Sequence, residues 1–213
     1  MSVPVIDFHT HIFPPQMREN RELYVRRDMT FAALYTDPKA RMATADDLVS
    51  VMDEDGIDVA VAMGIGWSDY DTACEANDYI IEATRRWQGK IIGFAGINPA
   101  WGSRAVRETE RCSDAGLRGI GELHPDTQGF DLADRDTMAG IMAVAQEHRL
   151  IVTTHSSEPV GHLYTGKGSV TPQVLMQFIG NFPEATIVCA HWGGGLPFYA
   201  LMPEIAAALH NIY

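Results

Sequence analysis

Short apolar runs alternate with longer amphipathic segments along most of the chain. The apolar runs predict strands at residues 3–8, 57–63, 91–97, 117–123, 150–154 and 186–190. The segments between them have helical patterning and predict helices at residues 45–55, 71–87, 104–115, 134–148, 171–181 and 196–209. Because strand and helix alternate in this way, we expect a parallel sheet joined by right-handed crossovers.

Two architectures fit this alternation, an open doubly wound sheet and a (β/α)8 barrel. The strands are continuous apolar runs, as expected when both faces of a sheet are buried. Metal-ligand and acid–base residues follow several different strands, and a barrel gathers all strand ends around one mouth. A doubly wound sheet would concentrate binding at a single switch point. The pattern therefore favours an α/β fold of the (β/α)8 TIM type.

The number of strand–helix units is smaller than eight. Six units occupy residues 1–213, whereas eight units of this spacing would exceed the ~250 residues typical of the fold. We therefore expect residues 1–213 to form a single barrel domain, truncated after six units and before a seventh strand. Exposed edges of an incomplete barrel favour assembly, so a homo-oligomer is one expectation.

Residues 12–43 interrupt the regular alternation. This stretch is rich in arginine, glutamate and proline and contains no clear strand. We expect a loop insertion over the barrel mouth, with room for a short helix. The insertion would either bind substrate or act as a lid, or it would serve only as packing.

Composition excludes several classes of partner. The chain has 213 residues, of which 46% are hydrophobic, and a net charge of −12 from 16 basic and 28 acidic residues. This charge argues against nucleic acid and against an anionic membrane surface. No apolar stretch approaches the ~18 residues of a membrane span, and no signal peptide is expected. Three cysteines without motif spacing indicate reduced thiols, so we expect a cytoplasmic protein with a small-molecule substrate.

The sequence Asp-Phe-His-Thr-His at residues 7–11 is the most distinctive chemical motif. Residues i and i+2 of a strand point to the same side, so His9 and His11 can face one ion. Neutral imidazole binds zinc and other divalent transition metals. The motif therefore predicts a metal site at the end of the first strand.

Three further metal-ligand residues stand at the ends of later strands. His155 follows the fifth strand, and His191 follows the sixth and precedes three glycines. Glu122 adds a carboxylate at the end of the fourth. A single buried histidine is more often structural, but several at the same end of a parallel sheet favour a shared site. His124 follows Glu122 by two positions, and we expect it to bind substrate or to support the ligands.

These segments together resemble the amidohydrolase superfamily, in particular the amidohydrolase-2 group of metal-dependent hydrolases and decarboxylases. The resemblance covers essentially the whole chain and rests on residues 7–14, 153–156 and 190–194. It implies a distorted (β/α)8 barrel with one or two divalent ions at its mouth, zinc first, with manganese, cobalt or iron as alternatives. It implies metal ligation by His9, His11, Glu122, His155 and His191.

The residue after the fourth strand separates two chemistries within this resemblance. Glu122 is similar to the glutamate of TatD-like hydrolases, which can bridge two metals, and the decarboxylases generally lack such a residue. We therefore expect a metal-dependent hydrolase of a small-molecule amide, lactone or ester bond, with Glu122 and His191 as catalytic residues. The alternatives are a nonoxidative decarboxylase of an unsaturated or aromatic carboxylic acid, and a truncated non-catalytic relative. The family's eighth-strand aspartate, which accepts the proton of water, has no counterpart assigned here.

The loop at residues 156–168 carries polar and aromatic side chains near the expected mouth. We expect substrate contacts from His162, Tyr164 and Lys167, with Lys167 suited to a carboxylate. An ordered surface loop is the alternative. Trp192 is expected either to wall the substrate pocket or to pack in the core.

Overall fold

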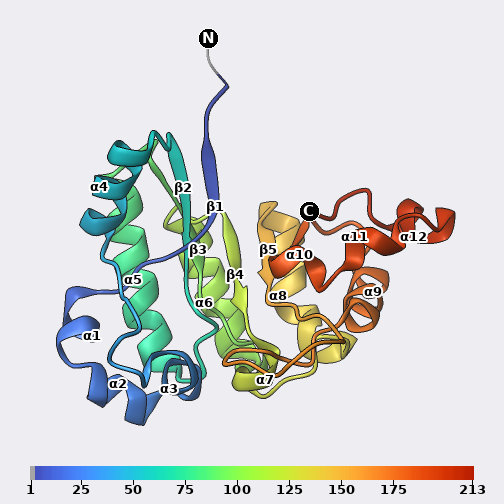
Figure 1. Ribbon diagram of the computed structural model, residues 1–213, viewed down its shortest axis with the longest axis horizontal. Helices are drawn as coiled ribbons and strands as arrows, with labels where there is room; N and C mark the ends of the chain where they lie inside the picture. Colours follow the sequence, from blue (N-terminus) through green and yellow to red (C-terminus); the bar gives the residue numbers. More distant parts are fainter. Residues whose placement is uncertain (1–2) are drawn as a thin grey trace.

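The fold is seen in a computed structural model that describes residues 3–213 and contains one curled sheet of six parallel strands (Figure 1). The strands lie in the order in which they occur along the chain. They are β1 (Ile6–His11), β2 (Val59–Met63), β3 (Ile91–Ala95), β4 (Gly119–Leu123), β5 (Ile151–Thr154) and β6 (Ile187–Cys189). A doubly wound sheet reverses direction at a switch point, whereas this order never reverses. The TIM-type architecture is therefore confirmed, as a half-barrel of six strands.

Five long helices cover the outer face of the sheet (Figure 1). They are α4 (Ala45–Asp55), α5 (Tyr70–Arg86), α6 (Ser103–Asp114), α8 (Arg135–His148) and α9 (Pro172–Asn181), and their bounds lie within one residue of those expected. Capping explains why the first is so well defined, because Thr44 and Asp47 form a reciprocal capping box. No helix in the described part of the chain is long and apolar enough to span a membrane.

Side-chain alternation along the strands builds two apolar layers. On β2, Ala60 and Ala62 face the helices and belong to the main core. The alternate residues Val61 and Met63 face the concave side and pack with Phe94. Both faces of the strand are therefore buried, as its continuous apolar pattern indicated.

The first strand differs from the expected one in position and burial. It begins at Ile6 and includes both histidines, with a register shift between Asp7 and Thr10 that marks a β-bulge. Val3 and Val5 are 86% and 54% exposed. These two residues precede β1, which lies at the edge of the sheet beside β2, so the start of the apolar run is left uncovered.

Residues 12–43 form three short helices rather than the expected loop. These are α1 (Pro15–Glu19), α2 (Arg21–Arg27) and α3 (Met29–Tyr35), and they gather at the lower end of the view in Figure 1. Each is too short to give a recognisable helical period. They are held by a second apolar cluster, in which Met17, Tyr24 and Phe31 pack with Trp67.

The prediction of a single helix at residues 196–209 is also wrong. Residues 196–209 instead form α11 (Leu196–Tyr199) and α12 (Pro203–Ala208), and the short element α10 (Ala190–Gly193) precedes them. The break lies before Pro203, which lacks an amide hydrogen and disfavours helical geometry in the preceding Met202. Two further short elements, η1 (Pro99–Trp101) and α7 (Pro125–Gln128), follow β3 and β4.

The last residues of the chain pair with β6. The amide of Cys189 donates to the carbonyl of Tyr213 at 2.8 Å, and the amide of Tyr213 donates to the carbonyl of Ile187 at 2.9 Å. A parallel bridge joins Ile187 to Ile212. Residues 211–213 therefore lie against β6 through an isolated bridge, and the sheet keeps the six strands that the sequence predicted.

Candidate metal centre

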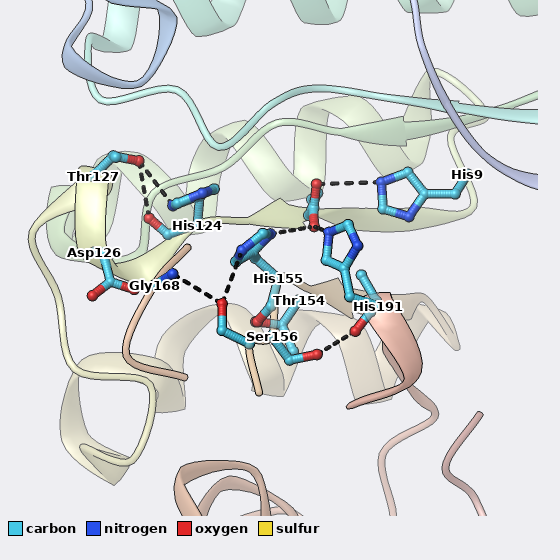
Figure 2. A network of polar contacts seen from close by, with 12 residues as sticks. His9, His124, Asp126, Thr127, Thr154, His155, Ser156, Gly168 and His191 are labelled. Carbon is cyan, nitrogen blue, oxygen red and sulfur yellow. Dashed lines mark hydrogen bonds and ion pairs between the residues drawn. The ribbon is translucent and has the colours of Figure 1, made fainter. Parts of the chain in front are cut away.

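Five side chains meet where the strands end on the concave side of the sheet. Their donor atoms form two groups in which every atom lies within 4.8 Å of the others, and Glu122 belongs to both. The first group is His9, His11 and Glu122, and the second is Glu122, His155 and His191. Figure 2 shows His155 and His191 facing the same carboxylate that His9 approaches from the other side. The five residues expected as metal ligands are thus close together.

The two carboxylate oxygens of Glu122 face different groups. Oε2 lies 3.3 Å from Nε2 of His9 and 3.6 Å from Nε2 of His11, and the two histidine atoms are 3.1 Å apart. Oε1 lies 3.2 Å from Nδ1 of His155 and 3.8 Å from Nε2 of His191. Glu122 therefore stands between two pairs of imidazoles.

These separations fit divalent metal binding. Donors bonded to one ion at 2.0–2.1 Å lie about 2.9 to 3.4 Å apart at octahedral or tetrahedral angles. The first group matches this spacing closely, and in the second group the contact to His191 is the longest. Nitrogen and carboxylate donors in this arrangement can hold one ion in each group.

Hydrogen bonding already prepares the ring of His11 for a cation. Its Nδ1 lies 3.3 Å from the carbonyl oxygen of Met63 on β2. Because a carbonyl can only accept, Nδ1 carries the hydrogen and Nε2 presents its lone pair to the centre. The ring of His155 is held in a similar way, with Nε2 lying 3.4 Å from the hydroxyl of Ser157.

The carboxylate at the centre is an anion. Burial alone would raise the pKa of Glu122, but hydrogen bonds from His155 and His9 and the charges of the nearby imidazoles hold it well below its usual range. Burial lowers the pKa of His11, against the attraction of Glu122. Burial also lowers the pKa of His191. The centre therefore offers one negative charge together with the rings of His11 and His191, for which burial favours the neutral form, and this suits a cation.

A cavity of about 230 Å³ opens onto the centre. Besides the five donor residues, it is lined by His124 and Tyr164, which were expected near the substrate, and by Leu34, Thr165 and Gly166, which were not. Leu34 comes from α3, and a Cβ on Gly166 would touch it. The two covering segments thus meet over the cavity. Sequence reasoning placed residues 12–43 over the mouth but had no signal for a particular residue.

Three residues expected at the substrate pocket do not line this cavity. The ammonium group of Lys167 binds Glu158 at 3.1 Å and the carbonyl oxygen of Val160 at 2.7 Å, inside its own loop. His162 is exposed and its ring stands 5.9 Å from that of Tyr164. Trp192 is 74% exposed and borders a different cavity, next to Tyr213.

The backbone after β6 explains why His191 and Trp192 separate. The backbone of both residues is left-handed, with φ of 55° and 57°. Residues other than glycine rarely adopt this conformation. Gly194, also left-handed, packs so closely that a Cβ there would strike the backbone of Ser157. This tight turn directs the ring of His191 towards Glu122.

Burial points to one residue near the centre that the sequence did not reveal. The ring of Tyr35, at the end of α3, stacks on Phe31 with centroids 5.1 Å apart. Burial, followed by the charge of Glu122, raises the pKa of Tyr35 to about 12. Its hydroxyl therefore stays protonated at neutral pH.

Solved structures share the fold at low sequence identity. A 5-carboxyvanillate decarboxylase from Sphingomonas paucimobilis superposes with a TM-score of 0.75 at 16% identity, over 99% of this chain and 80% of that one. A manganese complex of a 5-carboxyvanillate decarboxylase from Novosphingobium aromaticivorans gives 0.70 at 19%, over 93% and 68%. A 4-oxalomesaconate hydratase from Rhodopseudomonas palustris gives 0.63 at 20%, over 98% and 72%.

Sequence comparison assigns the family. A search of curated proteins finds no match to the chain. The sequence profile of the amidohydrolase family Amidohydro_2, in contrast, matches residues 6–213, which include all five candidate metal ligands. The chain therefore belongs to the amidohydrolase family.

Proposed function

We propose that this protein is a metal-dependent hydrolase that opens an amide, lactone or ester bond of a small molecule. The observation that carries the proposal is the position of Glu122, with Oε2 towards His9 and His11 and Oε1 towards His155. A carboxylate with its two oxygens facing two donor groups can hold two cations side by side, as in many two-metal hydrolytic sites.

The donor set accepts several divalent metals. Imidazole and carboxylate ligands bind zinc, manganese, cobalt and iron, so zinc, the metal expected from the sequence, is one member of the set. The similar decarboxylase from Novosphingobium was solved with manganese. When bound, a divalent ion lowers the pKa of its water to about 7 and polarises a carbonyl oxygen.

The residues of the chain divide the remaining tasks. Glu122, as a buried anion, balances the positive charge of the ions. His191 has the most exposed side chain of the five, at 54%, and is therefore placed to reach the scissile group of a substrate. Leu34 and Tyr164 line the entrance, where they keep bulk water from the reacting atoms.

A nonoxidative decarboxylase is the second candidate. Two of the similar structures bear the name of a 5-carboxyvanillate decarboxylase. The apolar surface of Leu34 and the ring of Tyr164 would pack against an aromatic or unsaturated acid in the cavity. The same centre would then hold the substrate. The carbon that bears the carboxylate would gain a proton, and its bond to the carboxylate would break with release of carbon dioxide.

One assay separates these functions. Metal-free protein is reloaded with manganese or zinc and offered a panel of esters, lactones, amides and aromatic acids, with acid release and carbon dioxide measured in parallel. The proposal predicts metal-restored hydrolysis that Glu122→Gln abolishes and that His210→Asn, an exposed histidine outside the centre, retains. Carbon dioxide release without hydrolysis would establish the decarboxylase. Tight metal binding without any turnover would instead indicate a non-catalytic relative.

A further inference from the structure

His124 lines the cavity but belongs to neither donor group. It is 3% exposed, and its ring stacks on that of His155 with centroids 4.3 Å apart (Figure 2). Its Nε2 is buried and has no hydrogen-bond partner among the described residues. Buried polar atoms are nearly always paired, so an unpaired nitrogen beside a cavity marks a place for a ligand group.

Two threonines determine which nitrogen of His124 carries the hydrogen. Oγ1 of Thr30 lies 2.5 Å from the carbonyl oxygen of Gly66 and 2.7 Å from Oγ1 of Thr127. The carbonyl can only accept, so the single hydroxyl proton of Thr30 is donated to Gly66. The proton of Thr127 then has two acceptors outside the imidazole ring, Oγ1 of Thr30 and the carbonyl oxygen of His124 at 3.3 Å.

Thr127 consequently has no proton left for the imidazole ring of His124. Its Oγ1 lies 3.1 Å from Nδ1 of His124, a contact drawn as a dashed line in Figure 2, and this bond requires a hydrogen on Nδ1. In the neutral imidazole the other nitrogen then bears a lone pair. Nε2 is thus an acceptor, and it can be satisfied only by a group that donates.

We propose that His124 recognises the substrate through Nε2, which accepts a hydrogen bond from a hydroxyl or N–H group of the substrate. This inference rests on the proposed function, and it narrows the substrate to a small carbonyl or carboxyl compound that carries such a donor within a few bonds of its reacting carbon. The short distance between this donor and the reacting carbon follows from the stacking of two rings. His124 lies directly against His155, whose Nδ1 faces Glu122. His124 is here a specificity residue and needs no change of charge to act.

The tautomer can be measured without any substrate. Long-range proton–nitrogen correlation spectra of the protein labelled with 15N-histidine distinguish a protonated ring nitrogen from one with a lone pair, and the signals lost in His124→Phe identify the residue. We expect a protonated Nδ1 and a bare Nε2. Thr127→Val should shift the hydrogen towards Nε2, whereas Thr137→Val, in which the lost hydroxyl contacts Asp134, should not. A hydrogen on Nε2 in the native protein would overturn the proposal.

The preference for a donor is tested with paired probes. Hydroxybenzoate isomers and the matching methoxybenzoates are titrated into the protein with and without manganese, and their affinities are measured by calorimetry. We expect one hydroxybenzoate to bind about tenfold more tightly than its methoxy partner, because the ether oxygen would face a second lone pair. His124→Phe should equalise the pair, and Thr127→Val should favour the ether.

These results are independent of turnover. If no metal-dependent reaction is found but the tautomer and the preference are as expected, the proposed function fails and the role of His124 in binding stands. Equal affinity for every hydroxy and methoxy pair in the native protein, or no binding of either series, would overturn the role of His124 even in an active enzyme.

Discussion

The rings of His9 and His191 lie with centroids 5.9 Å apart, although the two residues stand at the ends of the opposite edge strands of the sheet. In a flat sheet, five steps of about 4.8 Å would separate these strands by about 24 Å. The sheet must therefore curl strongly. This curvature converts ligands spread over the whole sequence into one centre.

The central role of Glu122 leads to a prediction about metal content. Glu122→Gln keeps the size of the side chain but removes the anion that faces both donor groups. We expect metal affinity to fall by more than about tenfold, measured by competition with a chelator and by elemental analysis. His210→Asn, which changes an exposed histidine away from the centre, serves as the control. Unchanged affinity in Glu122→Gln would show that the ions bind elsewhere.

The turn that orients His191 depends on Gly194. Gly194→Ala would place a Cβ against the carbonyl of Ser157 at a φ of +59°. We expect a loss of more than about 2 kcal/mol in the free energy of unfolding, together with weaker metal binding. Gly180→Ala is the matched control, because that glycine lies in α9 with open space around it, and it should stabilise by about 0.5–1 kcal/mol. Denaturant titration of both variants measures these changes in the free energy of unfolding.

An ion pair within α6, whose carboxylate also binds Asn77 of α5, should govern part of the acid stability. Glu108 is buried and accepts hydrogen bonds from Arg111 and Asn77. Burial opposes its charge, but these bonds lower the pKa of Glu108 below its ordinary value. A lowered pKa means that the stabilisation is complete above about pH 4.5 and is lost as the pH falls through the folded-state value.

The variant Glu108→Gln should therefore cost about 2 kcal/mol at pH 7 and flatten the decline of stability towards acid. Glu110→Gln, at an exposed position of the same helix, is the control. It should leave both the stability at pH 7 and its decline towards acid unchanged. Unfolding by urea at several pH values measures the effect. A decline as steep in Glu108→Gln as in the native protein would contradict this assignment.

Lys167 should order its loop rather than bind substrate. Its ammonium group already contacts Glu158 and the carbonyls of Val160 and His162. We expect Lys167→Ala to speed amide hydrogen exchange at residues 158–168 by about fivefold, whereas Lys39→Ala should have no such effect. If Lys167→Ala left exchange unchanged and weakened the binding of anionic ligands instead, the sequence-based expectation would be the better one.

Hydrophobic periodicity was sufficient to predict the regular part of the fold. The long helices and the parallel strands are specified by local patterning, and ligands at successive strand ends indicated a common site. The clustering of the candidate ligands could be anticipated in part because strand geometry places His9 and His11 on one side. The bridging position of Glu122 depends on the curl of the sheet, which no local pattern reports.

Other features depend on contacts between distant segments. The helices at residues 12–43 are stabilised by Trp67 and its neighbours, so their short sequences gave no signal. Trp192 lies away from the cavity because the backbone is left-handed at His191. The position of the ring hydrogen of His124 is inferred from the contact between Thr30 and Thr127. Thr30 lies far from His124 in the sequence, so no local pattern reveals this contact.

Anomalous diffraction from crystals grown with manganese tests the central claim most directly. The account predicts a peak within bonding distance of Nε2 of His9 and His11 and Oε2 of Glu122, with a second peak between Oε1 of Glu122 and the rings of His155 and His191 when both groups are filled. The absence of any peak among these five residues, with manganese bound at another place in the protein, would contradict it.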